Sequence, residues 1–412
     1  MTKKHLLIIA LVWPEPSSTA AGNRMLQLIQ YFLRKNYQIT MASTAIESEL
    51  SIDLDTLGIQ KASIQLNHSS FDEFVTQLNP EVVLFDRFLT EEQFGWRVAE
   101  FAPNALRILD TEDLHSLRQT REKCFKNSIP FSTDAWLNEG ITKREISSIY
   151  RSDISLIISL YEMYLLKDVL RMDESILIYL PFLLDPISKE EEQTWNSFEN
   201  RVDFSCVGNG KHAPNVDAIV WLKSEIWPLI RKQLPKANLK IYGAYLPERI
   251  RQMHTENEGF LVKGWAENVN EVFNQARVNL APLRFGAGLK GKLIDAMQNG
   301  TPSVTTSVGA EGMHGDLDFN GQIAETSENI AASAIELYKN QSLWEEAQTN
   351  GFEIINTLYD KSVWIEKLDA KIGSVQKDLE THRKNNFVGA ILGHQTMAST
   401  KYMSKWIEEK NI

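Results

Sequence analysis

The sequence contains little cysteine and no long apolar run. Only two of its 412 residues are cysteines, Cys124 and Cys206. Two cysteines are too few for a disulfide framework or a cysteine-based metal site, and this usage is typical of proteins in a reducing cytoplasm. No stretch of about 18 or more consecutive apolar residues occurs, so we expect no membrane-spanning segment. We therefore expect a cytoplasmic protein.

A surplus of positive charge is also absent. The 43 lysine and arginine residues are outnumbered by 54 aspartate and glutamate residues, which gives a formal net charge of −11 at pH 7. General nucleic-acid binders neutralise phosphates with a basic surface. We therefore expect no nucleic-acid partner, although this balance does not exclude a local basic patch.

Several catalytic and metal-binding motifs are missing as well. No pair of histidines has the spacing of zinc ligands. Neither the GxSxG turn of hydrolases nor the GxxxxGKS or GxxxxGKT loop of phosphate-binding proteins occurs. The tripeptide DLD at residues 316–318 lies outside a predicted strand end, so we assign no metal to it. We therefore expect neither a metal nor another cofactor.

The chain does contain a regular alternation of short apolar runs and helical patterns. Its length exceeds what one hydrophobic core supports, so we expect two domains of about 150–200 residues each. In the first half we predict strands at residues 5–12, 37–43, 62–66, 82–85, 106–109, 154–159 and 176–180. In the second half we predict strands at residues 202–207, 239–242, 260–263 and 278–282. This alternation predicts parallel sheets wound on both faces, with ligands at the carboxyl ends of the strands.

Residues 185–200, which include the charge run KEEEQ, are the best candidate linker. We predict an N-terminal Rossmann-like domain at 1–185, a C-terminal one at 186–375 and a helical tail at 376–412. The tail has apolar patches at 387–392 and 397–407. Two interpretations stay open for it: packing back on the first domain, or contact with a membrane surface or a partner. The apolar run at 6–13 also has two readings, a buried first strand, which we favour, and a secretion signal.

The most informative stretch is residues 277–306, RVNLAPLRFGAGLKGKLIDAMQNGTPSVTT. An apolar run is followed by three glycines with interleaved lysines, and then by a helical pattern that ends at Gly300 and Pro302. A strand, a glycine turn and a helix leave unpaired backbone N–H groups beside two cations, which suits a phosphate or diphosphate. The alternative from these residues alone is a glycine turn with two solvated lysines.

This stretch, from PLRFGAGLKGK onward, resembles the donor-binding segment of GT-B glycosyltransferases of the retaining "group 1" (family-four-like) class. In the second half the resemblance continues through FSCVGNGKHAPNVDAIVWL, IYGAYLP and VKGWAENVNEVFNQARVNLAPL. In the first half it is weaker and rests on SSTAAGNRM and RILDTEDLHSLRQTR.

The resemblance implies an α/β protein with two doubly wound Rossmann-like domains facing each other across a cleft, and a C-terminal helical segment crossing back. It also implies transfer of a sugar, with retention, from a nucleoside-diphosphate sugar in the second domain to an acceptor in the first.

The resemblance also implies a set of site residues. The candidate catalytic residues are His115, Lys211 and Lys290. Lysines beside a diphosphate would stabilise the negative charge that grows on the leaving group, and Lys290 is expected to turn its backbone N–H toward the phosphates. The candidate donor-binding residues are Gly22, Gly264, Trp265, Ala266, Phe285, Gly286, Ala287, Gly288, Leu289, Lys290, Lys292 and Asp295.

Several of these positions have competing interpretations. Asp295 occupies the second acidic position of the family's two-glutamate motif and would accept hydrogen bonds from ribose hydroxyls, or it pairs with Lys292 on the helix surface. Ala287 stands where the first glutamate is expected, so that role must fall to another residue or to backbone. Trp265 either stacks on the base or packs in the core.

In the first half, Gly22 would permit close approach of the ligand at a helix N-terminus. Asn23 and Arg24 could add donors there, and Asp110 and Arg118 accompany His115 as weaker candidates.

Two other functions stay open, a nucleotide-sugar 2-epimerase and a non-catalytic nucleotide-sugar binding protein. For a transferase, the expected partners are a nucleotide-sugar donor and a glycan, lipid-linked or protein acceptor. Bacterial surface polysaccharide or glycan synthesis is the setting that the resemblance suggests. The oligomeric state is not predicted.

Overall fold

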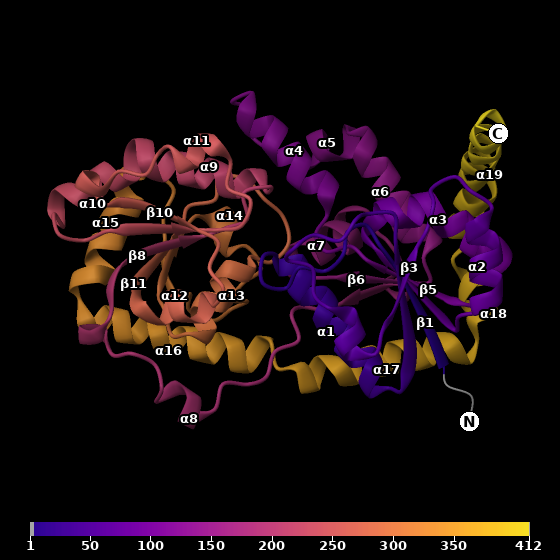
Figure 1. The fold of residues 1–412 in the computed structure, drawn as a ribbon, viewed down its shortest axis with the longest axis horizontal. Coiled ribbons are helices and arrows are strands. Elements are labelled where there is room, and N and C mark those ends of the chain that lie inside the picture. Colours follow the sequence, from indigo (N-terminus) through magenta and orange to yellow (C-terminus); the bar gives the residue numbers. More distant parts are fainter. Residues whose placement is uncertain (1–3, 412) are drawn as a thin grey trace.

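Within the part of the chain that the structure describes, two α/β domains lie side by side, each built around a parallel sheet (Figure 1). The structure is a computed structural model that describes residues 4–411, apart from the side chains of residues 395–397. Loops at the carboxyl ends of both sheets meet between the domains.

The first sheet has the strand order β3-β2-β1-β4-β5-β6-β7. Its strands are β1 (Lys4–Ala10), β2 (Tyr37–Ser43), β3 (Gln60–Ser63), β4 (Val82–Asp86), β5 (Leu106–Asp110), β6 (Ile154–Ile157) and β7 (Leu177–Tyr179). Its helices are α1 (Ala20–Arg34), η1 (Leu54–Leu57), α2 (Ser70–Leu78), α3 (Arg87–Phe101), α4 (His115–Lys126), α5 (Thr133–Asn138), α6 (Gly140–Arg151), α7 (Leu160–Tyr164), η2 (Leu165–Val169) and η3 (Glu174–Ile176).

Both faces of the first sheet are buried. In β1, Leu6 and Ile8 pack in the cluster that contains α1, whereas Leu7 and Ile9 pack in the cluster that contains α2 and α3. A strand buried on both faces reads as a continuous apolar run, which is the pattern that the sequence shows here.

The second sheet has the strand order β10-β9-β8-β11-β12-β13. Its strands are β8 (Val202–Val207), β9 (Leu239–Tyr242), β10 (Phe260–Gly264), β11 (Ala276–Ala281), β12 (Ser303–Thr305) and β13 (Gly321–Ile323). The helices of this half are α8 (Lys189–Glu192), η4 (Phe198–Asn200), α9 (Ala213–Trp221), η5 (Leu222–Ile226), α10 (Trp227–Gln233), α11 (Glu248–Arg251), η6 (Glu256–Glu258), α12 (Val269–Gln275), α13 (Gly291–Gln298), α14 (Ser307–Ala310), α15 (Ser327–Lys339) and α16 (Gln341–Leu358).

The predicted strands are confirmed, with bounds that differ from the predicted ones by up to three residues. The first apolar run forms β1, whose residues Leu6 to Ile9 are fully buried, so the strand interpretation of this run is confirmed. The third strand, predicted at 62–66, lies at Gln60–Ser63. This edge strand exposes most of its side chains, and the apolar residues Ile64 and Leu66 that suggested a later strand lie beyond its end.

The chain crosses between the domains at two adjacent points. The amide of Leu184 donates to the carbonyl of Tyr359 at 3.0 Å, and the amide of Lys361 donates to the carbonyl of Leu184 at 2.8 Å. The first crossing opens the predicted linker, residues 185–200, which contains the short helix α8. The second crossing leads into α17 (Lys361–Lys377).

The C-terminal helices pack back on the first domain (Figure 1), which is one of the two interpretations that the sequence left open and the one that the resemblance implies. In α17, Leu368, Ile372 and Val375 join the core of the first domain, so the chain returns before the predicted boundary at residue 375. The helices α18 (Leu379–Asn385) and α19 (Phe387–Lys410) follow, and α19 lies against α3 and α6. The predicted apolar patch at 397–407 begins with Met397, whose side chain lies outside those that the structure describes.

Among the described helices, none combines the length and the hydropathy that crossing a membrane requires. The exposed large apolar side chains of α19 are Phe387, Val388, Ile391, Tyr402, Met403 and Trp406.

Candidate functional site

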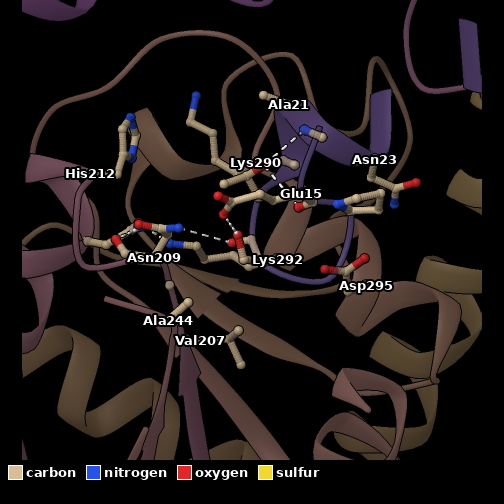
Figure 2. Close-up of a pocket in the computed structure, with 18 of the residues that line it drawn as sticks. Glu15, Ala21, Asn23, Val207, Asn209, His212, Ala244, Lys290, Lys292 and Asp295 are labelled. Carbon is tan, nitrogen blue, oxygen red and sulfur yellow. Dashed lines mark hydrogen bonds between the residues drawn. The ribbon is translucent and has the colours of Figure 1, made fainter. Parts of the chain in front are cut away.

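A cavity of about 820 Å³ lies between the two domains. The first domain contributes the loop at residues 11–19, the start of α1 and the segments that follow β4 and β5. The second domain contributes the loops that follow β8, β9, β10 and β11, and the first turns of α13. Figure 2 shows residues from both domains around this cavity. Enclosed sites at the carboxyl ends of parallel strands are where α/β proteins bind ligands.

The N-terminus of α13 forms part of the cavity wall. Lys290 is the N-cap, and Gly291 and Lys292 are the first two helical residues, whose amides have no acceptor within the helix. The Lys290 amide itself donates to Met313 Sδ at 3.3 Å. The Lys290 backbone N–H thus already has an acceptor within the second domain, contrary to the expectation that it faces the phosphates, whereas the amides of Gly291 and Lys292 have none within the helix.

The two lysines of this turn are not solvated side chains. Lys290 is 6% exposed, and its Nζ donates to the carbonyl of Gly288 at 2.6 Å. Lys292 Nζ donates to Asn215 Oδ1 in the first turn of α9. Burial lowers the pKa of each amine to about 8. Two partly desolvated cations thus line the cavity next to a helix N-terminus, where an anion is stabilised by both.

Asp295 lies one turn further along α13 and lines the same cavity. Burial raises the pKa of its carboxyl to about 7, against the opposing charge of Lys292. No ion pair joins Lys292 and Asp295 within residues 4–411, so the surface-pair interpretation is not what the structure shows. Its carboxyl faces the cavity, as a contact with ribose hydroxyls would require.

Lys211 and His115 face the cavity from opposite domains. Lys211 is exposed, and its Nζ lies 3.5 Å from the centre of the Tyr245 ring. His115 is the first residue of α4, with Nε2 at 3.3 Å from Asp113 Oδ1. Burial lowers the pKa of His115 to about 4, so its imidazole is neutral at pH 7. Arg118 Nε lies 3.1 Å from the other oxygen of Asp113, which places this weaker candidate in the same cluster.

The glycines of the predicted site do not all line the cavity. Gly22 lines the cavity, but its amide donates to Thr19 Oγ1 at 2.9 Å, and a Cβ there would lie 2.5 Å from the carbonyl carbon of Glu15. Its lack of a side chain therefore serves the fold of its own loop. Gly264 and Gly288 have φ angles of +80° and +63° and are not among the residues that line the cavity.

The remaining predicted donor residues line the cavity. These are Trp265, Ala266, Phe285, Gly286, Ala287 and Leu289. Trp265 is 45% exposed, and its Nε1 donates to the carbonyl of Ser17 at 3.2 Å across the cleft. The interpretation of Trp265 as a core residue is therefore wrong.

Arg24 and Asp110 do not act at the cavity surface. They form a completely buried ion pair at 2.9 Å, and Arg24 Nη1 also donates to the carbonyl of Leu180 at 2.8 Å. The suggestion that Arg24 donates to a ligand is therefore wrong, whereas Asn23 lines the cavity.

The sequence reasoning missed other cavity residues, namely Glu15, Arg87, Glu112, Asn209, His212, Asn215 and Tyr245. His212 and Asn215 fall in the quoted segment FSCVGNGKHAPNV, so the resemblance could have suggested them.

Arg87 and Glu112 follow the strands β4 and β5 with φ angles of +69° and +63°. Such angles strain residues other than glycine and tend to occur at functional sites, but no local sequence pattern reveals them.

No group of three or more histidine, cysteine, aspartate or glutamate side chains in the described residues is arranged to hold a metal ion. Metal independence itself remains a prediction.

Comparison with known proteins agrees with this geometry. Residues 201–340, which include most of the second domain, match the family model described as Glycosyl transferases group 1. A protein of Klebsiella pneumoniae described as an uncharacterized 44.6 kDa protein in the cps region is 27% identical over 161 residues. That match covers 37% of this chain and 42% of the relative, so the chain spans less than half of it.

Solved structures match over nearly the whole chain. The pneumococcal O-GlcNAc transferase GtfA, in complex with UDP and GlcNAc, has a TM-score of 0.68 at 13% identity, with 92% of this chain and 100% of that chain covered. A glycosyltransferase from Rickettsia africae ESF-5 has a TM-score of 0.65 at 11% identity, with 92% and 100% covered. Anabaena HepE, in complex with UDP and glucose, has a TM-score of 0.63 at 12% identity, with 90% and 100% covered.

The chain therefore has the GT-B fold and carries a glycosyl transferases group 1 domain in its second half, as the sequence predicted.

Proposed function

We propose that this protein is a glycosyltransferase, which moves a sugar from a nucleoside-diphosphate sugar to an acceptor bound in the cleft. The observation that carries the proposal is the N-terminus of α13 with Lys290 and Lys292 on the cavity wall. Negative charge grows on the diphosphate as the glycosidic bond breaks. Fixed amides and buried cations stabilise that charge more in the transition state than in the bound substrate, which accelerates the reaction.

Each domain has its own role in this proposal. The second domain binds the donor through α13, with Asp295 toward the ribose and the segment from Gly264 to Ala266 toward the base. The first domain binds the acceptor, since its loops close the other side of the cavity. His115 is neutral and acts there as a hydrogen-bonding group rather than as a cation.

Retention of the anomeric configuration is part of the proposal. Ala287 places no carboxyl where the family's first glutamate would stand. Departure of the diphosphate and attack by the acceptor on the same face need no carboxylate nucleophile, because the leaving oxygen can take the acceptor's proton.

A uridine diphosphate sugar is the proposed donor class, because GtfA and HepE are described with UDP. The acceptor is a glycan, lipid-linked or protein hydroxyl, and surface polysaccharide synthesis is the proposed setting, since the Klebsiella relative lies in the cps region. We place the protein in the cytoplasm, where nucleotide sugars are made. Contact of the exposed apolar side chains of α19 with a membrane stays a prediction.

The test is to supply UDP-glucose and UDP-GlcNAc with and without glycan acceptors and to follow the donor by NMR. Transfer with retained configuration, unaffected by EDTA, is the expected result. An epimerised sugar nucleotide without acceptor would support a 2-epimerase instead. Tight UDP binding with neither transfer nor hydrolysis would support a non-catalytic binding protein.

A further inference from the structure

Side chains of the first domain hold the donor turn of the second domain, residues 285–290 between β11 and α13. The carbonyl oxygen of Gly286 accepts a hydrogen bond of 2.9 Å from Arg121 Nη1. The amide of Gly288 donates a hydrogen bond of 2.9 Å to Glu162 Oε1. Arg121 lies on α4 and Glu162 on α7, both in the first domain. Two main-chain groups of the donor turn are thus satisfied across the domain boundary.

Arg121 is fixed from several sides. Its guanidinium makes two hydrogen bonds of 2.8 Å to the carboxyl of Glu311, which directly follows α14 in the second domain. It also lies 5.0 Å from the ring centres of both Phe131 and Tyr161. A planar guanidinium can satisfy a carboxylate and a carbonyl at once, whereas a lysine ammonium lacks this fork geometry. Arg121 therefore joins α4, the donor turn and the segment after α14.

Glu162 is completely buried and accepts hydrogen bonds from main-chain amides of both domains. Besides the Gly288 amide, its Oε1 accepts a hydrogen bond of 2.9 Å from the amide of Leu114, the residue before α4. Burial, and then the charge of Asp113, raises the pKa of Glu162 to about 8. The carboxyl is therefore largely protonated at pH 7, and a glutamine has the same shape and charge.

The backbone contact at this turn is close. A Cβ on Gly288 would lie 2.8 Å from Asp113 Cβ and 3.5 Å from Ile158 Cγ2 in the first domain. A Cβ on Gly291 would lie 2.6 Å from Ala20 Cβ at the start of α1. The donor turn is therefore closely packed against the first domain. The two hydrogen bonds lie within this packed interface.

We propose that Arg121 and Glu162 are positioning residues for the donor, which hold the donor turn so that Lys290 and the N-terminus of α13 face the diphosphate. Neither residue lines the cavity, so each acts through the turn and not on the ligand. The inference rests on the proposed function. It adds that the donor site of the second domain is complete only when the first domain is docked on it.

This arrangement couples donor binding to the contact between the domains. If the domains separate, Gly286 and Gly288 lose these partners and the donor turn is held only within its own domain. A donor that requires the held conformation then favours the docked domains, by no more than its difference in affinity for the two states. Substitutions in the first domain should consequently weaken binding of a nucleotide that contacts only the second.

The test uses the full chain with UDP and UDP-glucose as probes. Arg121→Ala and Glu162→Ala should each weaken UDP binding by roughly tenfold or more, as loss of a buried hydrogen bond to a charged or strongly polar group does. They should also raise the KM for UDP-glucose more than they lower kcat, and speed hydrogen exchange at the Gly288 amide. Glu162→Gln should restore UDP binding to within about threefold of wild type, whereas Arg121→Lys should not.

Two control variants separate positioning from loss of stability. Arg144→Ala removes a two-bond pair with Glu92 on the outside of the first domain, and Glu91→Ala removes a buried pair with Arg151. Both controls should lower the melting temperature without changing UDP affinity or exchange at Gly288. Wild-type UDP affinity and unchanged Gly288 exchange in Glu162→Ala and Arg121→Ala would overturn the inference. If wild type binds no nucleotide, the proposed function fails, and exchange at Gly288 alone still decides whether these side chains hold the donor turn.

Discussion

Tyr245 and Glu15 meet across the cleft, where the Tyr245 hydroxyl donates a hydrogen bond of 3.0 Å to Glu15 Oε1. Glu15 belongs to the loop before α1 in the first domain, and Tyr245 follows β9 in the second. The same loop accepts a hydrogen bond from Trp265 at Ser17 and one from Asn209 at Ser18. The cleft is therefore closed over this side of the cavity.

Tyr245→Phe removes one of these closing contacts and leaves the ring on which Lys211 lies. We expect a cost of about 1 kcal/mol to the closed form, seen as a larger radius of gyration of the free protein in small-angle scattering. The KM for UDP-glucose should rise about fivefold, because part of the donor's binding energy is used to close the cleft. Tyr402→Phe, at an exposed tyrosine of α19, is the matched control. Identical scattering and KM in both variants would mean that the hydroxyl of Tyr245 does not contribute to closure.

UDP affinity should depend on pH through Lys290 and Lys292. Burial lowers the pKa of both amines to about 8 in the free protein. The charged forms bind the diphosphate, so affinity should be level from about pH 7 to 7.5 and fall as the pH rises through 8. Calorimetric titrations with UDP up to pH 9.5 measure this slope, which should disappear in a Lys290→Met, Lys292→Met double variant. A pH dependence that persists in the double variant would show that groups other than these two lysines cause it.

Asp295→Ala should weaken UDP binding. The loss of affinity should be smaller for an analogue that lacks both ribose hydroxyls. The carboxyl faces the cavity with no ion pair to Lys292, so its proposed partner is the ligand. The melting temperature of Asp295→Ala without ligand, compared with that of wild type, shows separately whether the substitution destabilises α13. Equal losses of affinity for UDP and for the dideoxy analogue would show that Asp295 supports α13 and not the nucleotide.

Much of the fold could be predicted from the sequence, because strands buried on both faces appear as apolar runs with clear ends. The edge strand β3 was displaced in the prediction, since its own side chains are mostly exposed and the nearest apolar residues follow it. The return of the chain to the first domain within α17 was also missed. The helical pattern of Leu368, Ile372 and Val375 shows that a face is buried, but not which domain buries it.

Most of the predicted residues that line the cavity from the second domain lie in one continuous segment, from Phe285 to Asp295, which is why the sequence could place them together. The contacts that bring the domains together could not, since Arg121 and Gly286, or Glu15 and Tyr245, are far apart in the chain. Gly22 illustrates a different limit. A glycine at a helix N-terminus suggests room for a ligand, yet the space of its missing side chain is filled by the backbone of Glu15.

The most direct test of the account is the turnover of Lys290→Ala at saturating UDP-glucose, measured as release of UDP in the presence of an accepted glycan. Lys290 stands at the start of α13 on the cavity wall, where it would stabilise the charge that develops on the leaving diphosphate. The account predicts that kcat falls by two or more orders of magnitude, about 3 kcal/mol in the barrier, while the melting temperature of the free variant stays close to that of wild type. A kcat within about threefold of wild type, ~0.6 kcal/mol, would contradict the placement of the diphosphate at this helix.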